Sequence, residues 1–313
     1  MENATYSEIN EVKASFDDIY SEPDPRSYFR VLGGLDYTIP DLARPIFQQI
    51  VNARAKSQER PVTVLDLGCS YGINAALLRL PLKFDTLRRR YMMPEIQALP
   101  SPKLRGIDRH YFRGWPAQDD LEIVGLDVSS EAVSYAADVG VLDRALCEDM
   151  ENGKPSAQAR QALRNVDVII STGCVGYVTE KTFERILECN ENPEPPWIVS
   201  FVLRMFPYDA VTRTLGRFGL ETEKFEGATF VQRRFSDAKE FDHTLKTLER
   251  LGIDSDGHEA EGLFHAELFV SRPGSAVERQ PLGSLISIVS GGHRSYGRRY
   301  YRIPGVGKKL LQN

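Results

Sequence analysis

Short apolar runs alternate with segments of helical periodicity along most of this chain. Apolar and β-branched residues fill 62–67, 121–128, 166–171, 197–203, 229–233 and 264–271. Between these runs, apolar residues recur every three to four positions in 73–80, 180–189, 210–218 and 238–251. Alternation of strands and helices is typical of a mostly parallel sheet with helices on both faces. The pattern therefore predicts an α/β fold.

Three segments stand outside this alternation. Residues 1–58 combine helical periodicity with Tyr, Phe, Pro and Asp, which favours an N-terminal helical cap. Residues 81–120 are too long for an ordinary connection between a helix and a strand, so they are expected to form an inserted lid. Residues 274–313 contain one acidic residue and many Arg, Gly and Tyr, and they read as a basic C-terminal tail. The core is then expected to span 59–273.

Composition narrows the functional classes. The 313 residues include 39 Lys+Arg and 44 Asp+Glu, and the net charge of −5 removes the attraction on which non-specific nucleic-acid binding relies. No apolar run approaches the roughly 18–20 residues that span a bilayer, and the polar, acidic start does not resemble an export signal. The four cysteines are far apart and form no metal-binding pattern. We expect a cytoplasmic protein without a membrane, nucleic-acid or metal partner.

Candidate chemistry lies where the predicted strands end. The sequence DLGCSYG at 66–72 joins the first strand to the first helix, and its glycines let the backbone approach a ligand closely. Asp127 ends the next strand, where a carboxylate can accept hydrogen bonds from the two hydroxyls of a ribose. The sequence EDM at 148–150 follows a third apolar stretch and suits the amino group and the ring face of an adenine. The three segments together predict a nucleoside site.

The segments VLDLGCSYG, IVGLDVS and CEDM resemble the motifs of the class I S-adenosylmethionine-dependent methyltransferases, over residues 60–272. The resemblance implies S-adenosylmethionine as the cofactor and a Rossmann-like, seven-stranded sheet, mostly parallel, with its last strand antiparallel. It implies a cofactor site made of Asp66, Gly68, Ser70, Gly72, Asn74, Asp127, Val128, Asp149, Met150 and Ser171. Ser70 stands where the family commonly has a glycine. The turn does not match the GxGxxG pattern of nicotinamide enzymes, and no P-loop pattern is present.

Substrate residues are expected beyond the fourth strand and in the cap. The segment 171–177 lacks the Asn/Asp-Pro-Pro-aromatic motif of many amino-group methyltransferases, which disfavours methylation of a nucleobase. Tyr177, in this segment, and Tyr20, in the cap, are the candidate catalytic residues, although packing alone also accounts for a tyrosine at either position. Three further cap residues are candidates for contact with the substrate: Arg26, Tyr28 and Tyr37.

The resulting hypothesis is methyl transfer to an oxygen or a nitrogen of a small, specialised metabolite. Methyl transfer from a sulfonium needs alignment and desolvation more than a strong base. One alternative keeps the cofactor but cyclises it to azetidine-2-carboxylate and methylthioadenosine. Another is a cofactor-binding scaffold without catalysis, whose basic tail docks on a carrier or biosynthetic partner protein.

Overall fold

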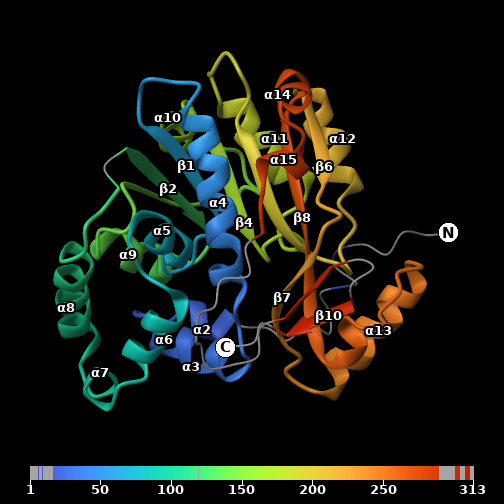
Figure 1. Ribbon diagram of the computed structural model, residues 1–313. Helices are drawn as coiled ribbons and strands as arrows, with labels where there is room; N and C mark the ends of the chain where they lie inside the picture. The colour runs from blue at the N-terminus through green and yellow to red at the C-terminus, as the bar shows by residue number, and fades with distance from the viewer. Residues whose placement is uncertain are drawn as a thin grey trace.

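The computed structural model describes residues 6, 9, 17–118, 120–288, 300–303 and 307–310. Within them, ten strands form one sheet (Figure 1). The strands are β1 (Val62–Leu67), β2 (Leu121–Asp127), β3 (Arg144–Cys147), β4 (Val168–Thr172), β5 (Trp197–Leu203), β6 (Leu220–Lys224), β7 (Thr229–Arg234), β8 (Leu263–Pro273), β9 (Tyr300–Ile303) and β10 (Gly307–Leu310). Their order across the sheet is β10-β9-β7-β8-β5-β4-β1-β2-β3, and β6 also pairs with β8.

Strands β1 to β5 are parallel, and β8 enters antiparallel between β5 and β7. Every residue of β1 and of β5 is buried, because helices cover both faces of the sheet at its centre. This burial explains why both strands read as continuous apolar runs in the sequence. The mostly parallel, Rossmann-like sheet is confirmed, with an antiparallel strand beside β5.

The sheet has more than the seven strands expected, for two reasons. Strands β6 and β7 both run antiparallel along β8, with Lys224 opposite Phe269 and Phe230 opposite Ala266, so together they form one interrupted strand beside β8. Between them the amide of Phe225 donates to the carbonyl of Leu268 at 2.9 Å, which continues the ladder. In addition, the hairpin of β9 and β10 in the C-terminal tail pairs with β7.

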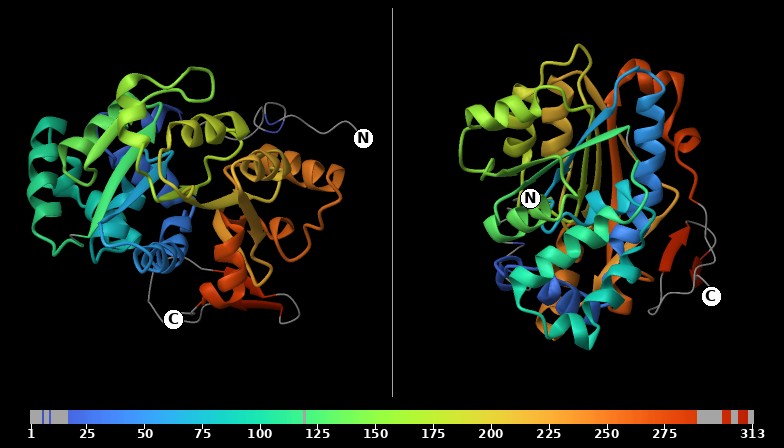
Figure 2. Two further views of the ribbon diagram at one scale, coloured as in Figure 1. Left: turned by 90° about the horizontal axis from the view of Figure 1, so that it is seen from above. Right: turned by 90° about the vertical axis from the view of Figure 1, so that its left-hand side faces the viewer.

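The helices cover the two faces of this sheet in two groups (Figure 2). One face packs against α4 (Ile39–Ala55), α5 (Ile73–Arg79) and α9 (Ser130–Asp138). The other packs against α10 (Ala157–Leu163), α11 (Glu180–Cys189) and α12 (Asp209–Arg217). A further helix, α13 (Ala238–Arg250), and a short 3-10 turn, η1 (Glu259–Glu261), lie between β7 and β8 in the chain. The helices expected from periodicity at 180–189, 210–218 and 238–251 are confirmed to within two residues.

The N-terminal cap packs against the insertion. The cap contains α2 (Asp17–Tyr20) and α3 (Arg26–Gly34), and the insertion contains α6 (Phe84–Tyr91), α7 (Pro94–Gln97) and α8 (Ser101–Arg113). The rings of Phe29 and Tyr91 stack at 4.8 Å between centroids. The guanidinium of Arg26 donates to the carbonyls of Gln97 and Leu99 at 2.9 and 2.7 Å. Figure 2 shows both sets of helices gathered at one end of the molecule.

The start of the C-terminal tail is ordered against the core. It forms α14 (Gly274–Arg279) and α15 (Leu282–Leu285), after which the amide of Ser287 donates to Gln49 of α4 at 2.8 Å. Of the tail arginines, Arg294, Arg298 and Arg299 lie outside the described residues. Docking of the tail on a partner protein stays a prediction. No helix in the described part of the chain is long and apolar enough to span a membrane.

Candidate active site

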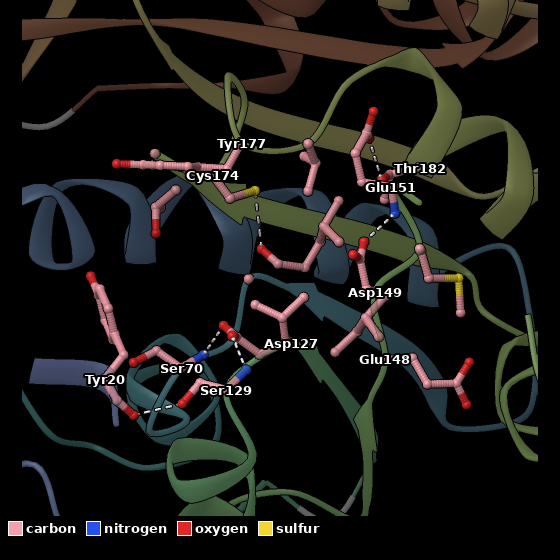
Figure 3. A pocket seen from close by; sticks show the side chains of 18 of the residues that line it. Tyr20, Ser70, Asp127, Ser129, Glu148, Asp149, Glu151, Cys174, Tyr177 and Thr182 are labelled. Carbon is pink, nitrogen blue, oxygen red and sulfur yellow. Dashed lines mark hydrogen bonds between the residues drawn. The ribbon is translucent and has the colours of Figure 1, made fainter. Parts of the chain in front are cut away.

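A cavity of about 660 Å³ opens at the carboxyl ends of the parallel strands, and we call it the carboxyl-end cavity. Its walls come from the cap, from the turns after β1, β2 and β3, from the loop after β4, and from β7. Figure 3 shows side chains from these segments facing a common space. Because each parallel strand ends at the same edge of the sheet, residues distant in sequence meet there.

The turn after β1 takes left-handed backbone conformations at three alternate positions. The φ angles are +73° at Gly68, +50° at Ser70 and +73° at Gly72. Gly68 lines the cavity, and a β-carbon there would lie 2.8 Å from the Cβ of Cys174. Gly72 does not line it; a β-carbon there would meet Val141 at 2.6 Å, so this glycine permits close packing of the turn. Ser70 lines the cavity in the conformation that a glycine would adopt more readily.

The carboxylate of Asp127 is held by two main-chain amides. Its Oδ2 accepts from the amide of Ser70 at 2.8 Å, and its Oδ1 accepts from the amide of Ser129 at 3.0 Å. A carboxylate offers about four acceptor positions, so each oxygen retains capacity toward the cavity. The neighbouring Val128 also lines the cavity, with 68% of its surface exposed. The turns after β1 and β2 are thus joined at the residue predicted to bind a ribose.

Asp66 and Asn74 lie behind this wall rather than in it. Asp66 is fully buried, and burial raises its pKa to about 7; the charge of Asp127 adds to this rise, and a hydrogen bond from Asn74 opposes it. Asn74 Nδ2 donates to Asp66 Oδ1 at 3.3 Å and to Thr172 Oγ1 at 3.0 Å. Oδ2 of Asp66 has no hydrogen-bond partner in the described structure. The hydrogen bonds of Asn74 therefore link the ends of β1 and β4, and Oδ2 of Asp66 remains available as an acceptor.

The segment after β3 forms one end of the cavity. Asp149 accepts hydrogen bonds from the amides of Glu151 and Asn152 at 2.9 and 3.0 Å, and hydrogen bonds from Asn152 hold its pKa below the usual range. Glu148 likewise accepts from the amide of Ser156 at 3.1 Å. Both carboxylates thus stabilise their own turns, although both line the cavity. Met150 is buried and presents an apolar surface there.

Tyrosines gather at the other end of the cavity. Figure 3 shows the hydroxyls of Tyr20 and Tyr177 on the same side, away from Glu148. Burial raises the pKa of Tyr20 well above its ordinary value and that of Tyr37 to about 12, so both hydroxyls are protonated at neutral pH. Tyr177 is half exposed, and all three tyrosines line the cavity.

Residues from the cofactor turns hold the cap segment that carries Tyr20. The Oγ of Ser129, next to Asp127 in the turn after β2, donates to the carbonyl of Tyr20 at 2.6 Å. The hydroxyl of Tyr71, from the turn after β1, lies 2.7 Å from the carbonyl of Ile19. The position of Tyr20 is therefore coupled to the two turns predicted to bind a nucleoside.

Three residues that were predicted to bind the substrate or the cofactor do not line the carboxyl-end cavity. Arg26 was expected to contact the substrate, but its guanidinium is used by Asp24 and by carbonyls of the insertion, and it does not line the cavity. Tyr28 is buried in an aromatic cluster behind Tyr37 and does not line the cavity either. Ser171 is fully buried, and its Oγ donates to Ser200 at 3.1 Å.

Two cavity residues on β7 escaped the sequence analysis. Gln232 and Arg233 line the cavity beside Tyr37, because the amide of Thr38 donates to the carbonyl of Gln232 at 2.9 Å and ties the cap to this strand. Arg233 pairs with Glu240 at 2.6 Å, with both side chains almost fully buried. The sequence does contain one indication of this site, because Arg233 lies in a segment that is otherwise typical of a buried strand.

The insertion also differs from the expected lid. No described residue of 81–120 lines the carboxyl-end cavity. The basic run at 88–90 pairs with nearby carboxylates, Asp85 for Arg88 and Asp108 for Arg90. The described part of the insertion therefore packs outside the cavity, against the cap and helix α9, whereas cap residues line the cavity.

Among known proteins, only solved structures resemble this chain. No family model matches the chain, and no curated protein matches it. The plantazolicin methyltransferase BpumL, solved with a pentazolic desmethyl analogue and S-adenosylhomocysteine, aligns at 14% identity over 86% of this chain and 98% of its own, with a TM-score of 0.45. The [4+2]-cyclase SpnF aligns at 13% identity over 72% and 80%, with a TM-score of 0.36. Phosphoethanolamine N-methyltransferase 2 of Haemonchus contortus aligns at 11% over 87% and 61%, with a TM-score of 0.41.

The order and directions of the strands decide the fold. Strands run β3-β2-β1-β4-β5 in parallel, followed by antiparallel β8 and then by the interrupted strand of β6 and β7. The chain has a class I methyltransferase fold. This fold places the carboxyl-end cavity where open α/β sheets bind ligands.

Proposed function

We propose that this protein binds S-adenosylmethionine in the carboxyl-end cavity and transfers its methyl group to an oxygen or a nitrogen of a small molecule. The observation that carries the proposal is the contact between Ser70 and Asp127, which joins the two predicted nucleoside-binding turns at the floor of the cavity. The same cavity also holds a tyrosine-lined end suited to an acceptor.

The chemistry of the walls fits this cofactor. Asp127 has acceptor capacity for two ribose hydroxyls after its two amide contacts are made. Met150 offers apolar surface to an adenine ring. Ser70 lines the cavity, and its buried Oγ lacks a hydrogen-bond partner within the described residues. The amino acid moiety of the cofactor would lie beside it, because buried polar atoms are normally satisfied.

The bound cofactor would supply an electrophilic methyl group on a sulfonium. The protein residues then need to align the acceptor with the methyl group and to exclude water from it. Tyr20 and Tyr37 stay protonated and can donate hydrogen bonds to an acceptor oxygen or orient an amine. Tyr177 borders the open side. Closure of the cap over the cavity would exclude water.

Among the described residues, the tyrosine end of the cavity holds no side chain that commonly serves as a base near pH 7, and the carboxylates of the lining come from the end of β2 and from the segments after β2 and β3. No histidine or lysine is among the residues that line the cavity, and burial raises the pKa of the Cys174 thiol to about 12. Arg233 is a permanent cation. The acceptor should therefore be a group that is nucleophilic without an enzymic base, such as a neutral amine or an acidic hydroxyl already ionised in solution.

The size of the cavity supports a small acceptor. Its volume of about 660 Å³ falls within the range of sites for single small ligands. Once the cofactor is accommodated, only the end near Tyr20, Tyr37 and Gln232 remains for the acceptor.

The test incubates the full chain with methyl-labelled cofactor and a small-molecule extract. We expect label in a small product together with S-adenosylhomocysteine. Tyr20→Phe should lower turnover by about 10- to 100-fold through loss of one donor at the reacting centre. Tyr111→Phe makes the same chemical change outside the cavity and should leave turnover unchanged.

The products separate the alternatives. Methylthioadenosine formed from the cofactor alone would replace the proposal with cyclisation. Cofactor binding without any product would favour the scaffold role.

A further inference from the structure

A second cavity lies at the opposite edge of the sheet, and we call it the amino-end cavity. It has a volume of about 1020 Å³. Its walls come from the end of α4, the segment before β1, the start of β5, the end of β8, and helices α14 and α15. Figure 1 shows α14, α15 and the end of α4 at the edge of the sheet away from α2 and α3. No residue lines both cavities.

Cations dominate the charged residues of the amino-end cavity. Its lining contains Arg54, Lys56, Arg60, Arg272 and Arg279 but only one carboxylate, Glu194. Five cations against one anion leave the wall strongly positive before neighbouring carboxylates are considered.

Two carboxylates from outside the lining neutralise part of this charge. Asp167 accepts from both terminal nitrogens of Arg60 at 2.7 Å, and Glu223 pairs with Arg272. With Glu194 these make three anions for five cations, so the excess is two positive charges.

The excess belongs to Lys56 and Arg279. Both are exposed, and neither forms an ion pair within the described residues. Arg279 donates only to the carbonyl of Ser275, at 3.1 Å. A ligand in the cavity would therefore meet two exposed cations that form no ion pair with a carboxylate of the described residues.

Hydrogen-bond donors without acceptors lie deeper in the same wall. Nε of Arg54, Nε1 of Trp197 and Nε of Arg272 are buried and have no partner among the described residues. The three side chains are themselves more than nine-tenths buried. The guanidinium of Arg272 lies 5.4 Å from the ring centre of Trp197, so two of the three donors belong to one stacked pair.

Buried donors are normally satisfied, so three unsatisfied ones along a single wall favour an acceptor there. The excess of positive charge requires that this acceptor be anionic. Arginine and lysine together are the side chains that recognise phosphate and carboxylate groups. We propose that the amino-end cavity is a second ligand site, which binds a small polyanion carrying phosphate or carboxylate groups.

The test titrates the full chain, without cofactor, with pyrophosphate and separately with citrate. The chain has two tryptophans, so the Trp115→Phe background reports on Trp197 alone. We expect a saturable change in Trp197 emission and a rise in Tm with at least one probe. A response to pyrophosphate alone assigns a phosphate ligand, and a response to citrate alone assigns a carboxylate ligand.

Paired variants distinguish a site from a general salt effect. Lys56→Gln with Arg279→Gln should weaken binding at least about tenfold, because each removes a charge-assisted contact. Arg213→Gln with Lys239→Gln removes two exposed cations outside the cavity and should bind as the parent does. Multivalent anions also stabilise proteins by exclusion from the surface. An equal Tm rise in all chains, or no saturable change in Trp197 emission, would overturn the proposal.

Because no cofactor is present, this result is independent of the proposed methyl transfer.

Discussion

The main-chain amide of Ser70 donates a 2.8 Å hydrogen bond to Oδ2 of Asp127. The bond is possible because Ser70 adopts a φ of +50°, which aims its amide at the end of the neighbouring strand. The first and second predicted cofactor motifs are therefore one structural unit before any ligand binds. The cap joins this unit through Ser129, which is bonded to both Asp127 and Tyr20.

The backbone of Ser70 provides the first prediction. A left-handed conformation costs about 1–2 kcal/mol for a residue with a β-carbon, and more for a β-branched one. Ser70→Val should therefore lower the free energy of unfolding by about 2 kcal/mol or more, whereas Ser70→Gly should match the parent or exceed it. Urea unfolding of the three chains measures this. Equal stability of the Val and Gly variants would show that the turn relaxes.

The strands could be predicted where burial on both faces makes their sequence continuously apolar. This holds for β1 and β5. It fails for β6, whose sequence LETEK is largely exposed at an edge and resembles a surface loop. The division of one strand into β6 and β7 could not be predicted either, because the interruption depends on pairing with β8 rather than on any local turn signal.

The positions of site residues could be predicted where they follow from the main-chain geometry of the sheet. They could not be predicted where they depend on side-chain packing. Gly68 and Asp127 lie in the cavity because they follow or end parallel strands whose carboxyl ends meet there. No comparable rule predicts where the residues of the cap lie. Arg26 was expected in the cavity, but its guanidinium donates to carbonyls of the insertion. Arg233 was missed because its burial is compensated by Glu240, a partner from the following helix.

The buried carboxyl of Asp66 predicts a pH dependence of stability. Burial raises its pKa to about 7 from 3.8, so between these values the folded state holds a proton that the unfolded state has lost. Stability contributed by this group is complete below pH 4 and falls as pH rises toward 7. Urea unfolding should show a loss of about 3 kcal/mol from pH 5 to pH 8 that is absent in Asp66→Asn.

Comparison of the two chains is needed because burial also raises the pKa of Glu259 to about 7. Glu259 contributes equally to both chains, so their difference reports Asp66 alone. Parallel pH profiles for parent and variant would contradict a raised pKa at Asp66.

The contacts of Arg26 predict a structural role. Arg26→Ala leaves the carbonyls of Gln97 and Leu99 without their donor, which should lower the free energy of unfolding by about 2 kcal/mol. Arg30→Ala, on the same helix but exposed, should change it by less than about 0.5 kcal/mol. Urea unfolding provides both values. A loss of turnover in Arg26→Ala without a loss of stability would restore the substrate role first expected for this residue.

Cap and insertion should respond differently to ligand. The cap lines the carboxyl-end cavity through Tyr20, Leu32 and Tyr37, while the insertion contacts the cap and helix α9 but does not line the cavity within the described residues. Binding of S-adenosylhomocysteine should therefore slow hydrogen exchange strongly in residues 17–38 and less in residues 84–113, with β4 and β5 unchanged. Equal slowing in the two segments would show that they close as one lid, and no slowing in either would show a preformed site.

The central claim, that the carboxyl-end cavity binds S-adenosylmethionine through Asp127, is tested most directly by calorimetric titration with S-adenosylhomocysteine. The parent chain should bind at one site. Asp127→Ala should weaken binding by about 100-fold, since it removes two hydrogen bonds to a charged acceptor. Asp149→Ala should weaken binding far less, because that carboxylate is engaged within its own turn. No binding by the parent, or equal affinity of the parent and Asp127→Ala, would contradict the account.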